Sequence, residues 1–252
     1  MDVKLVSRTL DLVEVFAECR RPLPLTELAR LLDAPVSSCL ALVRTQINRG
    51  YLYEVKKRGG YYPTKRLLNA ALQIDLGDPL LEVVREYLTQ LRDLTDETVV
   101  FGKLQETSVV YLDVVESTRA IRYNAKPGEH RSVHANSIGK SLFGQLSVQQ
   151  RAALAAKLDF RRYTESTLCD LESLIADVEA SKRRGWYANV GESAADLAAI
   201  AMPVELAGEA YGISVVGPIQ RILSHRERYR ESLQQVVETL LNDSKLTLDA
   251  PP

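Results

Sequence analysis

One short segment of the 252-residue chain has the composition of a phosphate-binding turn. Lys56, Lys57 and Arg58 are followed directly by Gly59 and Gly60, so three cationic side chains share a turn with two glycines. Cationic side chains that neutralise phosphates release condensed counterions, and they therefore strengthen binding to nucleic acids in a salt-dependent way. This segment predicts contact with a polyanion.

A second segment has the features of a seat for a small acid. Asn136, Ser137, Ile138 and Gly139 stand where a strand-like pattern changes to a helical one. The first N–H groups of a helix lack partners and the helix dipole attracts negative charge, so a helix start can hold a carboxylate. Gly139 would let the backbone approach a ligand closely. The alternative is that Asn136 or Ser137 only caps the helix.

Residue patterns typical of catalysis or metal binding are missing from the sequence. It has no hydrolase-like order of serine, histidine and aspartate, and no phosphate loop. His130 and His134 have no cysteine or acidic cluster at metal-ligand spacing. Cys19, Cys39 and Cys169 are odd in number and lie far apart, which argues against a disulfide framework and fits a reducing cytoplasm. We expect no enzymatic activity, no metal and no cofactor.

Composition and charge point to a globular protein with a basic front part. The chain is 46% hydrophobic and 26% charged, which excludes a disordered protein, and no apolar run reaches the ~20 residues that span a bilayer. Residues 1–75 hold 12 lysines and arginines against 8 aspartates and glutamates, whereas residues 76–252 hold 20 against 25. Only the front part is therefore expected to meet a polyanion.

The front part has the pattern of a winged helix-turn-helix domain. Apolar residues at helical spacing predict three helices, the last of which Gly50 closes as a C-terminal cap. Two strand-like runs then flank the basic turn and predict a hairpin. The expected helices cover residues 3–18, 25–32 and 37–48, the strands cover 51–55 and 61–64, and the domain covers 1–75.

The rest of the chain predicts an α+β domain with a mixed antiparallel sheet and helices on it. An amphipathic helix within residues 76–96 is expected to connect this domain, residues 97–252, to the front part. Ser147 and Gln150 have the spacing of a capping box. Strands are expected at 98–104, 108–115, 119–124, 186–190, 197–204 and 211–216, and helices at 136–146, 167–184 and 224–243.

Several short motifs occur in the order that one protein family shows. They cover residues 7–10, 25–29, 48–52, 134–140, 184–186, 191–192, 200–204 and 214–218. In this order and spacing the chain resembles the IclR family of bacterial transcriptional regulators. The resemblance implies a cytoplasmic, dimeric or tetrameric protein that binds double-stranded DNA. Its C-terminal domain, similar to GAF and PAS folds, would bind a small organic acid and alter operator affinity or polymerase recruitment.

The third helix of such a protein is the recognition helix, whose first residues face base edges in the major groove. A basic residue is common in the family where Val36 stands, and an arginine is common where Ala41 stands, so this helix offers fewer strong donors. Two recognition helices about one turn of DNA apart imply a pseudo-palindromic operator. The implied DNA-binding residues are Arg8, Val36, Ser37, Ser38, Ala41, Arg44, Lys56, Lys57 and Arg58.

The resemblance also implies effector-binding positions beyond the helix start at residues 136–139. Asn189 stands where the family frequently has an aspartate, and Ala199 stands where it frequently has a cysteine. Ser214 matches a frequent serine, whereas Val216 replaces a second polar residue. A pocket that lacks an acid, a thiol and a hydroxyl favours an effector with an apolar or aromatic portion beside its carboxylate.

Two alternative functions remain open at this point. The chain could be an enzyme or a small-molecule sensor without DNA binding. It could also be an interaction protein whose winged-helix head binds a protein partner, because Val36 and Ala41 weaken the case for base recognition.

Overall fold

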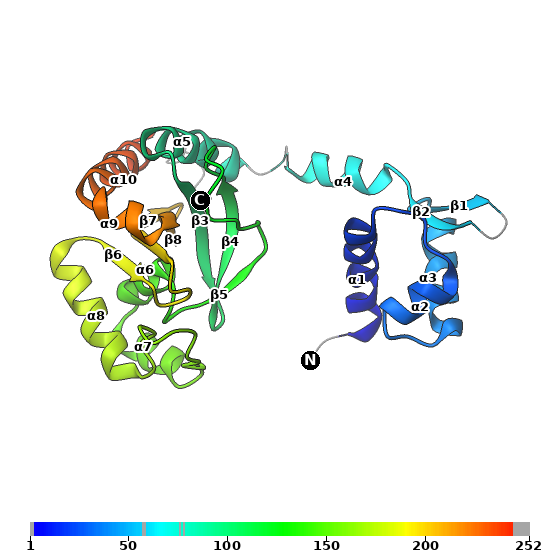
Figure 1. Ribbon diagram of the computed structural model, residues 1–252, viewed down its shortest axis with the longest axis horizontal. Helices are drawn as coiled ribbons and strands as arrows, with labels where there is room; N and C mark the ends of the chain where they lie inside the picture. Colours follow the sequence, from blue (N-terminus) through cyan, green and yellow to red (C-terminus); the bar gives the residue numbers. More distant parts are fainter. Residues whose placement is uncertain (1–2, 57–58, 76, 78, 244–252) are drawn as a thin grey trace. The chain divides into compact units, whose positions relative to one another are not determined.

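The computed structural model describes residues 3–56, 59–75, 77 and 79–243. The chain divides into two compact units, Met1–Asp78 and Pro79–Pro252, and each is described by itself (Figure 1). No helix of the described ranges is both long and apolar enough to cross a membrane.

The first unit has the order of a winged helix-turn-helix, as predicted. Its elements are α1 (Lys4–Cys19), α2 (Leu25–Leu31), α3 (Val36–Asn48), β1 (Leu52–Lys56), β2 (Gly60–Pro63) and α4 (Arg66–Asp75). The antiparallel β1–β2 pair places Tyr53 opposite Tyr62. A single apolar core of this unit contains Leu12, Phe16, Leu28, Leu42 and Val43.

The end of α3 confirms the predicted glycine cap. Gly50 adopts a φ of 76°, which side chains other than glycine rarely tolerate. Its N–H donates to the Ile47 carbonyl, and the Tyr51 N–H donates to the Gln46 carbonyl. This pair of bonds satisfies carbonyls at the helix end and turns the chain into β1.

The second unit contains a six-stranded antiparallel sheet in the order β5-β4-β3-β8-β7-β6. Its strands are β3 (Thr98–Gln105), β4 (Ser108–Val115), β5 (His130–Ser132), β6 (Tyr187–Val190), β7 (Leu197–Leu206) and β8 (Glu209–Pro218). Its helices are α5 (Pro79–Thr95), α6 (Ser137–Gln145), α7 (Val148–Ala155), α8 (Leu171–Arg184), α9 (Ile219–Ser224) and α10 (Arg226–Leu241). This arrangement confirms the α+β class.

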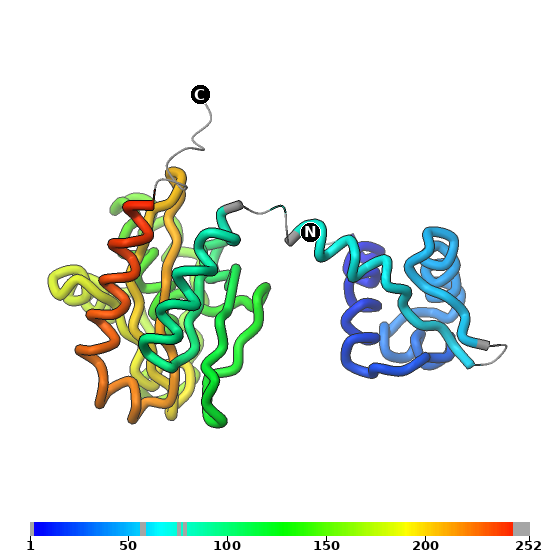
Figure 2. Tube along the Cα trace, turned by 90° about the horizontal axis from the view of Figure 1, so that it is seen from above, coloured from blue at the N-terminus to red at the C-terminus, as the bar shows by residue number. Residues whose placement is uncertain are grey.

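Helices cover both faces of this sheet. On one face α5 and α10 lie side by side, and residues such as Leu88 and Leu233 pack against Phe101 and Val215 (Figures 1 and 2). The helix that we predicted as a connector is α5, and its apolar side is buried in this core. On the other face α6 packs against β7 and β8. A second apolar cluster, which includes Ile138 and Leu142 of α6 and Ala201 of β7, fills this side.

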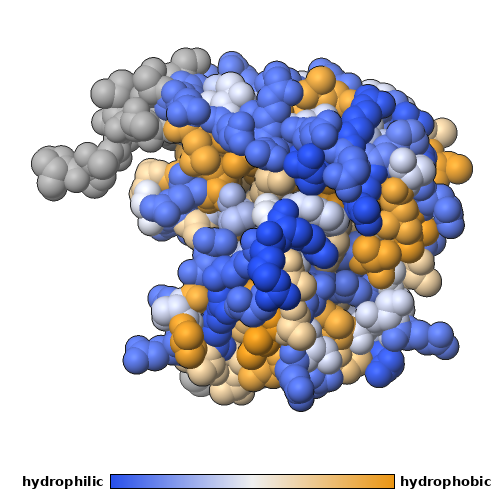
Figure 3. All heavy atoms as spheres, turned by 90° about the vertical axis from the view of Figure 1, so that its left-hand side faces the viewer, coloured by the Kyte–Doolittle hydropathy of each residue, from blue (hydrophilic) through white to orange (hydrophobic). Residues whose placement is uncertain are grey.

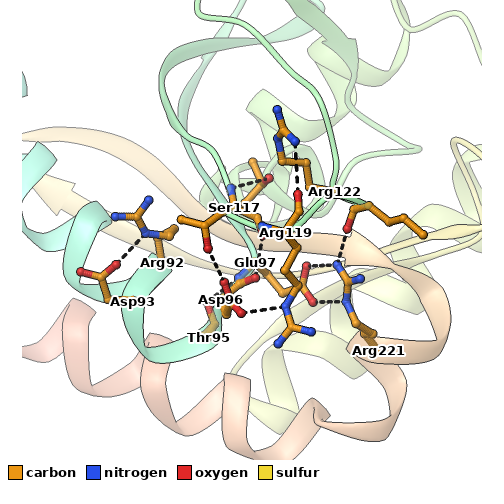
Figure 4. Close-up of polar contacts among 12 residues, drawn as sticks. Arg92, Asp93, Thr95, Asp96, Glu97, Ser117, Arg119, Arg122 and Arg221 are labelled. Atoms are coloured by element: carbon orange, nitrogen blue, oxygen red, sulfur yellow. Dashed lines mark hydrogen bonds and ion pairs between the residues drawn. The ribbon is translucent and has the colours of Figure 1, made fainter.

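The predicted strand over residues 119–124 is wrong. These residues form an irregular segment, and the third strand of the second unit is β5. Side chains take the carbonyls that a neighbouring strand would otherwise bind: Arg221 donates to Ile121 O at 2.8 Å, and Thr98 Oγ1 donates to Tyr123 O at 2.8 Å. Figure 4 shows the anchor of this segment, the bidentate pair of Arg221 with Glu97.

Three helix predictions also need correction. The helix expected from residue 167 starts at Leu171, and Asp170 is its N-cap. Thr167 lies before the helix because its Oγ1 donates a hydrogen bond to the Glu192 carbonyl instead. The helix expected over 224–243 is α10 (Arg226–Leu241), and the short helix before it, α9 (Ile219–Ser224), was not predicted. The helix α4 was not predicted.

Candidate nucleic-acid interface and effector site

The structure leaves the predicted recognition-helix residues at the surface of the first unit. Cys39, Leu42 and Val43 form the buried side of α3, so the residues between them point away from the core. Val36 is 49% exposed. The exposed positions of the predicted set are Val36, Ser37, Ser38, Ala41 and Arg44. A major groove could therefore reach this side without unfolding the unit.

Of the other predicted DNA-binding residues, the structure describes only some. Arg8 on α1 is half-buried, and its guanidinium lies 3.5 Å from the Asp33 carbonyl beside the α2–α3 turn. Lys56 ends β1. Lys57 and Arg58 lie outside the described residues.

Further exposed cations escaped the sequence analysis. Arg49 follows α3, while Lys65 and Arg66 stand at the start of α4. None of the three forms an ion pair within the described part of the chain, although the Arg66 guanidinium lies 5.2 Å from the centre of the Tyr51 ring. The positive charge of residues 1–75 was the signal that could have found them.

An apolar groove of about 730 Å³ lies in the first unit. It is lined by α1 and α3, with Leu5, Leu10 and Val13 among its residues, and Leu67 of α4 also borders it. Apolar side chains of α4 are exposed, including Ile74 at 76%. On the side that Figure 3 shows, where α8, α9 and α10 lie, apolar residues instead form separate patches among hydrophilic ones.

The predicted acid seat at residues 136–139 is the first turn of α6. Asn136 is the N-cap: its Oδ1 accepts from the Gly139 N–H at 3.0 Å, and its Nδ2 donates to the Tyr111 hydroxyl at 2.8 Å. Burial raises the pKa of Tyr111, so this hydroxyl stays protonated. The N–H groups of Ser137 and Ile138 have no acceptor within the helix, as in any first turn.

The structure gives a reason for a glycine at position 139 other than the close approach of a ligand that the sequence suggested. A Cβ on this residue would lie 2.5 Å from the Val133 carbonyl oxygen. The close approach that the glycine allows is therefore between α6 and the strand segment just before it. Any larger residue would push the first turn of α6 off that segment.

The four remaining predicted effector residues share the sheet face that packs against α6. Asn189, Ala199 and Val216 are directly opposite one another on β6, β7 and β8. Ser214 lies two residues from Val216 on β8 and therefore on the same face. All four are buried, and Ala199 and Val216 join Ile138 in one apolar cluster. The structure thus brings the predicted effector residues together.

The Asn189 side chain joins this sheet face to the start of α6. Its Nδ2 donates to the Ala135 carbonyl at 2.7 Å, just before α6, and its Oδ1 accepts from the Glu192 N–H at 3.0 Å. An aspartate could not donate the first of these bonds. Asn189 therefore fixes the start of α6 from the sheet side.

A buried ion cluster beside the seat was not predicted. Lys140 on α6 is fully buried, and its Nζ lies 2.8 and 3.0 Å from the two carboxylate oxygens of Glu192. The same Nζ lies 3.0 Å from Asp177 Oδ2 on α8. Burial raises the pKa of Glu192, while the Lys140 ammonium lowers it. The cluster ties α6, α8 and the loop after β6 to one another.

Comparison with known proteins identifies the family. The family described as "Bacterial transcriptional regulator IclR C-terminal" matches residues 77–241, and the one described as "IclR helix-turn-helix domain" matches residues 5–56. The chain belongs to the IclR family. This IclR-family chain is therefore a ligand-responsive transcriptional regulator of the helix-turn-helix type. The match to this family does not favour the alternative that the winged-helix domain binds a protein partner instead of DNA.

Curated relatives of this IclR-family chain are transcriptional regulators. The HTH-type transcriptional regulator BhcR of Paracoccus denitrificans is 30% identical over 228 residues, which cover 89% of this chain and 81% of that protein. The transcriptional repressor IclR of Escherichia coli is 28% identical over 228 residues, which cover 89% of this chain and 83% of that protein.

Solved structures share the fold of this IclR-family chain. The IclR protein of Thermotoga maritima has a TM-score of 0.75 at 16% identity, covering 94% of this chain and 98% of that one. An IclR homologue of Microbacterium hydrocarbonoxydans, solved in complex with 4-hydroxybenzoate, has a TM-score of 0.74 at 23% identity with the same coverage.

Proposed function

We propose that this chain binds a pseudo-palindromic operator through its first unit and a small organic acid through its second. One observation carries the DNA-binding half: the exposed side of α3 continues into exposed cations that have no acidic partner among the described residues. Arg44 and Arg49 belong to α3 and its cap, and Lys65 and Arg66 follow the hairpin. By contrast, Arg21 of the same unit is paired with Glu27 at 2.6 Å.

This surface favours phosphate contacts over base contacts. Val36 and Ala41 offer no hydrogen-bond donor from their side chains, whereas Arg44 can reach a guanine or a phosphate. We infer that affinity rests mainly on the backbone of the duplex, with Ser37, Ser38 and Arg44 supplying direct recognition.

A second copy of the chain would cover the exposed apolar side chains of α1 and α4, while the part of the groove that Ser38 and Ala41 line stays open to DNA. Leu5 and Leu10 on α1 and Leu68, Leu72 and Ile74 on α4 are all at least about half exposed, which is costly for a free monomer. Burying this face between two copies yields the dimer that a two-fold operator requires. Sedimentation velocity of the full chain distinguishes this dimer from a tetramer of two such dimers.

For the effector we propose a carboxylic acid with an apolar or aromatic body. Ala199 and Val216 supply apolar surface opposite α6, while the first-turn N–H groups of Ser137 and Ile138 suit a carboxylate. The Microbacterium homologue's complex with 4-hydroxybenzoate shows an acid of this class on the same fold. Thermal-shift titration with benzoate, 4-hydroxybenzoate and glyoxylate tests the class. Stabilisation by glyoxylate alone would refute the apolar portion.

Binding of the acid would change operator affinity by coupling the two units. Such coupling is typically about 1–3 kcal/mol, which changes occupancy roughly 5- to 150-fold. We place the protein in the cytoplasm and assign it no catalytic activity, because its curated relatives are regulators of transcription.

The test of DNA binding is an electrophoretic shift of the intergenic DNA upstream of the gene at several salt concentrations. We expect affinity to fall steeply with salt, and Arg44→Gln to lower the slope of log K against log salt by about 0.9. Arg30→Gln is the matched control, because Arg30 is an exposed cation of α2 that lies 3.9 Å from Glu27. Equal slopes for the two variants, or no shift at low salt, would contradict the proposal.

A further inference from the structure

The irregular segment over residues 116–125 connects two parts of the second unit. It begins directly after β4, and most of its residues are exposed. Its first residues contact the end of α5, and its last residues contact the apolar cluster at the start of α6. The segment therefore lies between the effector seat and the helix that follows the first unit in the chain.

The beginning of the segment binds the residue that follows α5. The Ser117 hydroxyl donates to the Asp96 carbonyl at 2.7 Å, and the Thr118 hydroxyl donates to Asp96 Oδ1 at 3.0 Å. Arg119 Nε pairs with Asp96 Oδ2 at 2.8 Å (Figure 4). Three consecutive residues of the segment thus converge on Asp96, where the backbone has a φ of 57° and turns from α5 into β3.

These contacts contribute little to stability, because they are exposed. The side chains of Arg119 and Asp96 are 43% and 42% exposed, and exposed ion pairs are weak in water. The last turns of α5 are held instead by Leu88 and Leu91, which are fully buried in the apolar core. The polar contacts therefore set how the end of α5 is joined to the segment, not whether α5 folds.

The end of the segment lies against the effector seat. Ala125 is buried in the apolar cluster that contains Ile138 of the first turn of α6, and Tyr123 packs against the same cluster. Tyr123 also lies beside the hydroxyl of Tyr111, which accepts a hydrogen bond from the cap residue Asn136. Protein interiors are close-packed, so an acid whose body enters this cluster must displace its neighbours. Tyr123 and Ala125 are among those neighbours.

One fully buried side chain connects the two ends of the segment. Thr98 Oγ1 donates to the Tyr123 carbonyl at 2.8 Å and accepts from the Ser117 N–H at 3.2 Å. A displacement of Tyr123 therefore reaches Ser117 through two hydrogen bonds. From Ser117 it reaches Asp96 through the contacts at the end of α5.

We propose that the segment over residues 116–125 carries the effector signal to α5, and that the Asp96–Arg119 pair is the contact that transmits it. Transmission of this kind rests on the proposed function, because it requires an acid at the seat and DNA on the first unit. Pro79 of α5 directly follows the first unit in the chain, so a shift of α5 acts on that unit. Helix shifts of about 1–2 Å belong to the common repertoire of allosteric transitions. Arg119 is a positioning residue, because its contacts are with Asp96 and Ser117 and not with the seat.

The test is the operator affinity of the full chain, measured by fluorescence anisotropy of labelled upstream DNA with and without saturating benzoate or 4-hydroxybenzoate. For the wild type we expect one of these acids to change the affinity by about 5- to 150-fold. Arg119→Ala is expected to reduce that factor at least about threefold, because residues in contact commonly couple at least this strongly. Arg230→Ala is the matched control and should keep the wild-type factor, since the ion pairs of Arg230 are with Glu227 and Glu231 of its own helix, α10.

Two further measurements separate transmission from a merely structural role. Asp96→Asn keeps the left-handed backbone, which asparagine tolerates, and removes the charge that Arg119 binds. It should reduce the factor as Arg119→Ala does, and the double variant should lose no more than either single variant. Calorimetry without DNA should give each variant the wild-type affinity for the acid within about twofold, because neither residue contacts the seat.

Undiminished coupling in Arg119→Ala, an equal loss in Arg230→Ala, additive losses in the double variant, or weaker binding of the acid would each overturn the proposal. If neither acid changes the operator affinity of the wild type, the proposed function fails together with it. If the wild type responds and Arg119→Ala responds equally, only the transmission through this pair fails.

Discussion

Replacing Lys140 by methionine removes the cation that joins α6 to Glu192 and to Asp177 on α8. The fully buried ammonium contacts both oxygens of Glu192 and one oxygen of Asp177. Methionine keeps most of the apolar stem but leaves a buried carboxylate without its partner. Breaking a buried pair in this way costs about 3–5 kcal/mol. For a unit of this size the unfolding temperature would fall by about 6–20 °C.

The matched control is Lys103→Met. Lys103 pairs with Glu209 at 2.5 Å, but the two side chains are 37% and 56% exposed. An exposed pair contributes less than about 1 kcal/mol, so this variant should unfold close to the wild-type temperature. Thermal and urea unfolding of the full chain, followed by circular dichroism, measures both. Equal stabilities of the Lys140 and Lys103 variants would refute the account of the buried cluster.

The pH dependence of the Lys140→Met variant provides a second check. Without the ammonium, burial and the nearby Asp177 carboxylate raise the pKa of Glu192 in the folded state without the opposing effect of Lys140. A carboxyl whose pKa is raised on folding favours the folded state below its unfolded pKa, and this contribution is lost as the pH rises through the folded pKa. The deficit of the variant should therefore be larger at about pH 8 than at about pH 5. A deficit that grows on acidification would contradict this explanation.

Two further substitutions, each with a matched control, have definite expected outcomes. Arg221→Ala should lower the free energy of unfolding in urea by about 3 kcal/mol or more, because it leaves the fully buried Glu97 unpaired. Arg119→Ala removes an exposed ion pair and should lower it by less than about 1 kcal/mol. Asn136→Ala should cost about 1–2 kcal/mol through the lost cap of α6 and should weaken binding of benzoate in calorimetry. Ser147→Ala removes the cap of α7 at a similar stability cost, and benzoate affinity should not change.

Local patterns were predicted well where a few neighbouring residues decide the structure. The capping box at Ser147 forms as expected, with both reciprocal hydrogen bonds present. The core side of α3 and its glycine end also follow from residues close in the sequence. The recognition-helix surface was predictable for the same reason, because exposed positions of an amphipathic helix are fixed by its apolar spacing.

Features that depend on distant partners could not be predicted. The alternating residues 119–124 have strand-like spacing, yet Arg221 and Thr98 bind their carbonyls from other parts of the chain. Lys140 stands in a helix without any local sign of burial, and its partners come from α8 and from the loop after β6. The sequence analysis explained Gly139 by the approach of a ligand. In the structure the group close to Gly139 is the Val133 carbonyl, which only the packing of α6 brings there. The missed helix α4 has exposed apolar residues that no core of its own unit explains.

The central claim is that one unit holds DNA while the other senses an organic acid. Fluorescence anisotropy of labelled upstream DNA, titrated with the full chain in the absence and presence of aromatic carboxylic acids, tests it most directly. We predict tight, salt-sensitive binding that at least one acid shifts by about 5- to 150-fold, with no such shift on scrambled DNA. Binding that is equal on both DNAs, or that no acid changes, would contradict the account.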